Sequence, residues 1–181
     1  MPSATLPVDR SKVSTLLARA AGLRQSGALA ESIPPQREAA RLDPGNYRIQ
    51  HDLGLACLQY GQLNEAVAAF QRCVTNNPRF AEGFWRLGLA YERMGQAAAA
   101  AAAYRQAVEL RPSLSEAQYG LANLLENLGH RTEAIGIFRK AAGAARKPTL
   151  RRIATARAFL AEGNDAAAET IFRQIVYLFS V

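Results

Sequence analysis

The sequence is poor in several residue types on which other classes of protein depend. Its 181 residues include only two Cys, two His and one Trp. Two Cys without framework spacing exclude a disulfide-stapled miniprotein, and no Cys and His set has metal-ligand spacing. Alternating runs of strand-forming residues are missing, and no segment approaches the roughly 18 consecutive apolar residues of a membrane-spanning helix. Charged residues interrupt the first 21 positions, so no signal-peptide core is present. We expect a cytoplasmic protein without a disulfide.

The residue types that are abundant in the sequence favour α-helix. The chain contains 36 Ala, and its basic residues are 19 Arg against 3 Lys, for a net charge of +7. Ala and Arg have high helix propensity. After Val13, apolar residues recur at spacings of three and four nearly everywhere, which is typical of amphipathic helices. The sequence therefore predicts an all-α protein.

Glycine recurs with a period of 34 residues through the whole chain, at Gly27, Gly61, Gly95, Gly129 and Gly163. Three other kinds of residue return at fixed offsets from these glycines. Seven positions before each glycine is a small residue, namely Ala20, Gly54, Gly88, Ala122 or Ala156. Nine positions after the last four glycines is an aromatic residue, namely Phe70, Tyr104, Phe138 or Phe172. Seventeen positions after the first three glycines is a proline, namely Pro44, Pro78 or Pro112. Since proline cannot continue a helix, one repeat is a helix, a glycine turn, a second helix and a proline stop.

These residues give the chain a resemblance to the tetratricopeptide repeat family, whose pattern is an aromatic, Leu-Gly, Tyr, and later Ala, an aromatic and Pro. The third repeat has nearly all of it: Phe84, Leu87, Gly88, Tyr91, Ala100, Tyr104 and Pro112. The second and fourth repeats keep most of the pattern. In the first, Gln36 takes the aromatic position, and Pro34 and Pro35 are expected to break or shorten the second helix.

The resemblance implies a right-handed α-solenoid of about five helix-turn-helix repeats. We expect an N-terminal arm at 1–12, a divergent first repeat at 13–46, and repeats at 47–80, 81–114 and 115–148. An incomplete or C-terminal repeat follows at 149–181. The family's first helices line a concave groove, which suits a peptide or a partner's helix.

Helical spacing predicts which residues line that groove, because positions 13, 10, 9, 6 and 3 before each glycine share one face. The groove candidates are Arg48, His51, Asp52, Leu55, Leu58, Trp85, Arg86, Leu89, Tyr119, Asn123 and Arg157. Aromatic and aliphatic residues with a charged rim are typical of interface hot spots. Two alternatives stay open: Trp85 packs structurally instead of anchoring a ligand, or the segment 1–11 covers Leu55 and Leu58.

No arrangement of residues predicts catalysis. The two histidines lie in different repeats, His51 and Asp52 are expected to diverge on their helix, and Cys57 and Cys73 occupy core positions. There is no glycine-rich phosphate loop. We expect no enzyme, no catalytic residue, no cofactor and no metal.

Two surface features remain. A basic run without an intervening acid comprises Arg139, Lys140, Arg146, Lys147, Arg151, Arg152 and Arg157. It is interpreted as solvated helix ends, with recruitment of an acidic protein or nucleic acid as alternatives. After Gln174 the chain is apolar on all sides, so a C-terminal interface is predicted at Phe172, Val176, Leu178 and Phe179. Either two chains pair there as a homodimer, or a further repeat or domain covers it.

The sequence thus predicts a cytoplasmic, non-catalytic scaffold that binds a protein or peptide partner in its groove. The alternative is the accessory N-terminal region of a larger enzyme, resembling bacterial sulfotransferases or glycosyltransferases preceded by such repeats. Nucleic-acid binding through the 139–157 basic run is a third hypothesis, and no membrane span is expected.

Overall fold

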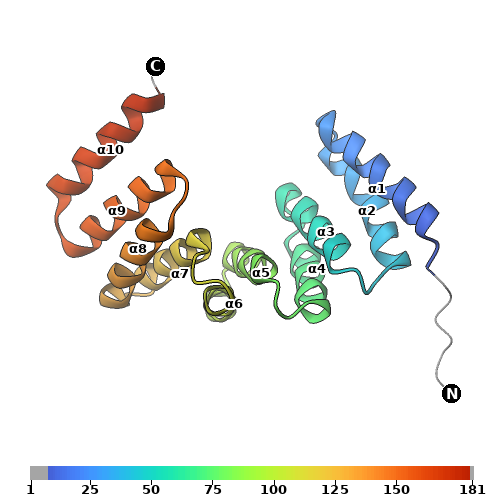
Figure 1. The fold of residues 1–181 in the computed structure, drawn as a ribbon, viewed down its shortest axis with the longest axis horizontal. Coiled ribbons are helices and arrows are strands. Elements are labelled where there is room, and N and C mark those ends of the chain that lie inside the picture. The colour runs from blue at the N-terminus through green and yellow to red at the C-terminus, as the bar shows by residue number, and fades with distance from the viewer. Residues whose placement is uncertain (1–7, 180–181) are drawn as a thin grey trace. The chain divides into compact units, whose positions relative to one another are not determined.

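The computed structural model describes residues 8–179, with the side chains of residues 8–175, and its regular structure in that range is α-helical (Figure 1). The chain divides into two compact units, Met1–Arg79 (unit 1) and Phe80–Val181 (unit 2). Unit 1 contains α1 (Arg10–Gln25), α2 (Leu29–Leu42), α3 (Tyr47–Tyr60) and α4 (Leu63–Asn76). Unit 2 contains α5 (Ala81–Arg93), α6 (Ala97–Leu110), α7 (Ser115–Asn127), α8 (Arg131–Ala144), α9 (Pro148–Glu162) and α10 (Asp165–Phe179).

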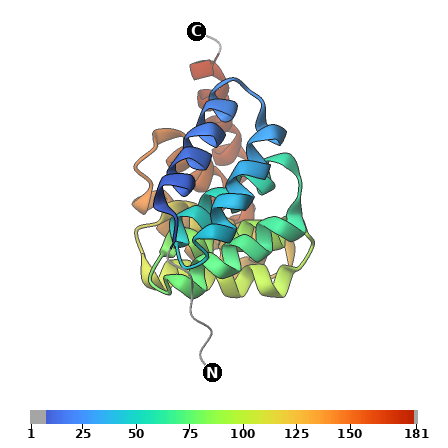
Figure 2. The same cartoon turned by 90° about the vertical axis from the view of Figure 1, so that its right-hand side faces the viewer.

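Consecutive helices pack as hairpins within each unit. In unit 1, α1 contacts α2, α2 contacts α3, and α3 contacts α4, and Figures 1 and 2 show the α1–α2 hairpin from two sides. In unit 2 every helix contacts the next, and the first helices of successive hairpins also touch, α5 against α7 and α7 against α9. The predicted all-α helical solenoid is confirmed.

The five glycines of the 34-residue period form the turns inside the hairpins. Their φ angles lie between 73° and 85°, the left-handed region that glycine adopts without steric cost. Among the described residues no others have positive φ. Pro44, Pro78 and Pro112 each follow the last residue of a second helix by two positions, as predicted.

The aromatic positions fill the core beside the closest helix contacts. Phe70, Tyr104 and Phe138 are fully buried. A Cβ at Gly54 would lie 2.6 Å from the Phe70 ring, and one at Gly88 would lie 2.6 Å from the Tyr104 ring. Glycine at these two positions therefore makes room for the aromatic side chain of its own hairpin.

The first hairpin departs from two predictions. Pro34 and Pro35 lie inside α2, yet the helix keeps its 14 residues. The amide hydrogen bonds that these prolines lack would have reached the carbonyls of Ala30 and Glu31, which belong to solvent-exposed residues, so water can bind them. The helix α1 begins at Arg10, within the predicted arm, because the Asp9 carboxylate accepts a hydrogen bond from the Lys12 amide at 3.0 Å and caps it. Residues 1–7 lie outside the described residues.

Candidate functional site

The first helices of unit 2 bring together one continuous face from three repeats. Helix α7 contacts α5 on one side and α9 on the other, so equivalent positions on the three helices are neighbours. Trp85 and Tyr119, one repeat apart, both pack at the edge of the same cluster of buried side chains. We call this face the α5–α7–α9 face. Of the predicted groove residues it carries Trp85, Arg86, Leu89, Tyr119, Asn123 and Arg157, all of them half-buried.

Trp85 combines packing with partial exposure. Its indole lies against two clusters of buried residues. The side chain of Arg86 covers part of the ring. The guanidinium carbon of Arg86 stands 3.8 Å from the ring centroid, a cation–π contact that holds both side chains in place. Packing and a partly accessible surface therefore coexist at Trp85.

Arg86 is a half-buried cation without a direct counter-ion. Among the described side chains none forms an ion pair with it, and its Nε is buried without a hydrogen-bond acceptor. Desolvation lowers the pKa of Arg86, and only the longer-range fields of Glu82 and Glu116 oppose that shift. A partly desolvated guanidinium can donate charge-assisted hydrogen bonds to a carboxylate.

Arg157 links α9 to α7. Its Nη2 donates hydrogen bonds to Glu126 Oε2 at 2.6 Å and to Asn123 Oδ1 at 2.9 Å. The guanidinium also lies 5.7 Å from the Phe138 ring centroid, and that ring packs against Tyr119. Sequence reasoning assigned Arg157 both to the groove and to the basic run, and the structure places it on the α5–α7–α9 face.

The corresponding residues of unit 1 lie on α3. Arg48 is exposed, whereas His51, Asp52 and Leu55 are half-buried. Leu58 was predicted to line the groove, but it is only 4% exposed, because an aliphatic side chain at this position gains more from burial than from contact with water. The prediction that His51 and Asp52 diverge is wrong, since His51 Nδ1 lies 3.3 Å from Asp52 Oδ1.

The basic run separates in space. Arg139 pairs with Glu162 at 2.7 Å, and Arg151 donates a hydrogen bond to the Ala145 carbonyl at 3.0 Å. With Arg157 on the α5–α7–α9 face, the run leaves three exposed members, Lys140, Arg146 and Lys147, and the half-buried Arg152. The basic run contains no acidic residue, but Glu162 and Glu126, which lie outside it in sequence, neutralise Arg139 and Arg157.

The remaining predictions concern the C-terminus, the thiols and metals. Phe172 is half-buried on α10, while the side chains of Val176, Leu178 and Phe179 lie outside the described residues.

Burial raises the pKa of Cys57 to about 12 and that of Cys73 to about 12, so both thiols stay protonated and unreactive. In the described part of the chain, no cluster of His, Cys, Asp and Glu could hold a metal ion. None of its helices has the length and hydrophobicity to cross a bilayer.

Comparisons with known proteins agree with this architecture. A family model described as tetratricopeptide repeat matches residues 86–149, and one described as TPR repeat matches residues 54–95. No curated protein sequence matches.

Several solved structures share the fold. A crystal structure of MamA is 20% identical, over 90% of this chain and 88% of that one, with a TM-score of 0.76. MamA 41-end from Desulfovibrio magneticus RS-1 is 16% identical, over 93% and 96%, with a TM-score of 0.77. YrrB, described as a TPR protein with an unusual peptide-binding site, is 18% identical, over 86% and 80%, with a TM-score of 0.66. These identities support a common fold and nothing finer.

Proposed function

The chain belongs to the tetratricopeptide repeat family, and from this we propose that it is a non-catalytic protein-interaction scaffold whose α5–α7–α9 face binds a segment of a partner protein. One observation carries the proposal. Trp85, stacked with Arg86 and partly exposed, lies on the same face as Tyr119 and Arg157, on helices that touch one another.

The composition of the face suggests what the partner segment contains. Trp85, Leu89 and Tyr119 offer apolar and aromatic surface of the kind that dominates binding energy at interfaces. Arg86 offers a desolvated guanidinium that lacks a direct counter-ion among the described residues. A segment with one large apolar side chain and a nearby Asp or Glu would satisfy both features. A cytoplasmic location and pairing of two chains through the last helix stay predictions.

The test uses the single Trp of the chain as its probe. Peptides selected on the intact protein from a random display library would be synthesised and titrated while the Trp85 emission is followed. We expect saturable emission changes. Tyr119→Ala should weaken binding by at least roughly tenfold, as loss of an interface hot spot does.

Arg105→Ala is the matched control, because Arg105 is exposed on the second helix α6. Circular dichroism should show wild-type helix content in both variants. Peptides that bind without changing the Trp85 emission, and equally well to Tyr119→Ala, would contradict the proposal.

A further inference from the structure

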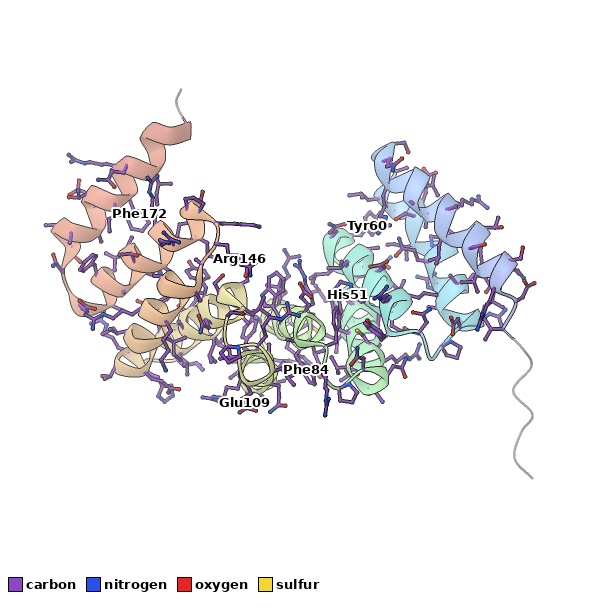
Figure 3. All side chains as sticks on the ribbon, viewed as in Figure 1. His51, Tyr60, Phe84, Glu109, Arg146 and Phe172 are labelled. Atoms are coloured by element: carbon purple, nitrogen blue, oxygen red, sulfur yellow. The ribbon has the colours of Figure 1, made fainter. Side chains whose placement is uncertain are left out.

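A second surface of unit 2 has features that the α5–α7–α9 face does not explain. A hollow of about 250 Å³ lies between the α6–α7 connection and the α8–α9 connection. Its polar lining consists of Arg111, Ser113, Ser115, Glu116, Arg146 and Lys147. The repeat itself brings the two connections together, because residues 34 apart occupy equivalent positions in successive hairpins. Lys147, 34 residues after Ser113, therefore occupies the position in the α8–α9 connection that Ser113 occupies in the α6–α7 connection. Figure 3 labels Arg146 near the second connection.

Positive charge dominates this hollow. Arg111, Arg146 and Lys147 outnumber the single carboxylate of Glu116. The nearest acid to Arg111 is Glu82, and their 3.6 Å separation is longer than a hydrogen bond. Within the described part of the chain, neither Arg146 nor Lys147 forms an ion pair. The N-terminal ends of α7 and α9 and the C-terminal ends of α6 and α8 all lie nearby, so their dipoles largely cancel and the side chains decide the sign.

The Glu116 carboxylate is already engaged. Its Oε2 accepts a hydrogen bond from the Ser115 hydroxyl at 3.1 Å. This leaves the three cations and the Ser113 hydroxyl as donors for a ligand.

The size and lining of the hollow restrict the ligand further. Its volume is below the roughly 300 to 1,000 Å³ of sites for drug-sized molecules, which favours a small group. No aromatic side chain lines it, so a nucleic-acid base has no ring on which to stack. Convergent Arg and Lys donors are suited to an anion with several oxygens and more than one negative charge.

We propose that this hollow binds a phosphate group with at least three unesterified oxygens, a feature that phosphate monoesters and inorganic phosphate share, because its charge of about −1.5 to −2 matches the donors and the charge excess of the hollow. The site is separate from the α5–α7–α9 face and does not depend on the function proposed for that face. The same chemistry could come from a phosphorylated side chain or from free phosphate.

Calorimetric titration of the full chain in a phosphate-free buffer tests the assignment. The probes are inorganic phosphate, a short phosphoserine peptide and the same peptide without phosphate. We expect the two phosphate probes to bind and the third not to bind. If the phosphoserine peptide binds more tightly than inorganic phosphate, the natural ligand is a phosphorylated protein. If the two probes bind with equal affinity, the natural ligand is free phosphate.

The variants make the site falsifiable. Arg146→Gln with Lys147→Gln should weaken phosphate binding roughly tenfold or more, since charge-assisted hydrogen bonds are lost. Glu116→Gln should tighten it severalfold, because it removes the one acid of the lining. Arg131→Gln is the control, since Arg131 is exposed at the opposite end of α8, about 20 Å from Ala144 along the helix axis.

Three results would overturn the assignment. One is the same affinity for the double variant and the wild type. Another is an equal loss in Arg131→Gln, which would indicate a net-charge effect alone. The third is binding of single-stranded RNA with no binding of either phosphate probe. Circular dichroism of every variant ensures that folded proteins are compared.

Discussion

We expect the buried amide of Gln36 to lower the stability of unit 1. Gln36 occupies the position at which other repeats place Phe70, Tyr104 and Phe138, and it is only 1% exposed. Neither its Oε1 nor its Nε2 has a hydrogen-bond partner in the described structure. A buried polar group without a partner costs about 1 to 3 kcal/mol.

Gln36→Leu should therefore raise the free energy of unfolding by about 1 to 2 kcal/mol, because it removes both unpaired atoms at nearly constant volume. Urea denaturation followed by circular dichroism measures this change. Gln106→Leu, at an exposed position on α6, serves as the control and should give no gain. A less stable Gln36→Leu protein would show that buried water or a neighbouring group satisfies the amide.

Glycines within the helices of the repeats have different roles. Gly88 faces the Tyr104 ring, whereas a Cβ on Gly136 of α8 would meet nothing within 4 Å. Gly88→Ala should destabilise the protein by about 1 to 3 kcal/mol through overpacking. Gly136→Ala should stabilise it by about 0.5 to 1 kcal/mol, because alanine is the better helix former. Equal effects in thermal denaturation would contradict the close contact at Gly88.

The two buried thiols couple stability to alkaline pH. Burial holds the pKa of Cys57 at about 12 and that of Cys73 at about 12, against 9.0 for an ordinary thiol. Above pH 9 the unfolded chain loses protons that the folded chain retains, so stability falls as pH rises. The loss is about 1.4 kcal/mol per pH unit for each thiol.

Urea denaturation at pH 8 and pH 10 measures this loss. Wild type should lose about 2 to 3 kcal/mol more than a Cys57→Ala, Cys73→Ala variant between these pH values. The burial of Tyr104 raises the pKa of its phenol and acts in both proteins, so it cancels in the comparison. The same loss in wild type and variant would show that the thiols titrate normally.

Helices α7 and α9 are joined by the half-buried Arg157–Glu126 pair, whose side chains are 28% and 19% exposed. A double-mutant cycle with Arg157→Gln and Glu126→Gln should give a coupling free energy of about 1 to 2 kcal/mol. The matched control is Arg173–Glu169 on α10, 78% and 63% exposed, for which we expect less than about 0.5 kcal/mol. Similar coupling in both pairs would mean that burial adds nothing to the first.

The helices and their hairpins could be predicted from the sequence because glycine turns and proline stops act locally. Gly61, Gly95 and Gly129 take the left-handed turns that their period indicates, and Pro78 and Pro112 follow helix ends. The two prolines of α2 were misjudged. Whether a helix tolerates a proline depends on whether the carbonyl four residues earlier, which loses its amide partner, can reach water. Only the structure shows that these carbonyls, in Ala30 and Glu31, belong to exposed residues.

The candidate site was predictable only in part. Helical periodicity placed Trp85 and Tyr119 on one face, since equivalent positions of stacked repeats are neighbours. The burial of Leu58 and the pairing of Arg157 with Glu126 depend on side chains brought together by packing, which periodicity does not determine. The hollow beside Arg146 was missed for the same reason, because Arg111 comes from the preceding connection.

Across the whole chain, the net charge of +7 conceals a division of roles among the cations. Arg37, Arg139 and Arg157 pair with acids on other helices. Arg86, Arg146 and Lys147 have no ion pair among the described residues, and we assign them to ligands together with Arg111, whose contact with Glu82 is 3.6 Å long. Arg157 belongs to both groups, since it pairs with Glu126 and lies on the α5–α7–α9 face, whereas substitutions of Arg37 and Arg139 should affect stability without affecting the binding that we propose.

Site-specific photocrosslinking tests the central claim, that the first-helix face of unit 2 holds the partner segment, most directly. A photoreactive phenylalanine analogue would replace Tyr119 on α7 or, as the control, the exposed Gln106 on α6, and each protein would be irradiated with a display-selected peptide. The account predicts a crosslinked adduct from position 119, lost on addition of excess unlabelled peptide, and none from position 106. An adduct from position 106 with none from position 119 would contradict it.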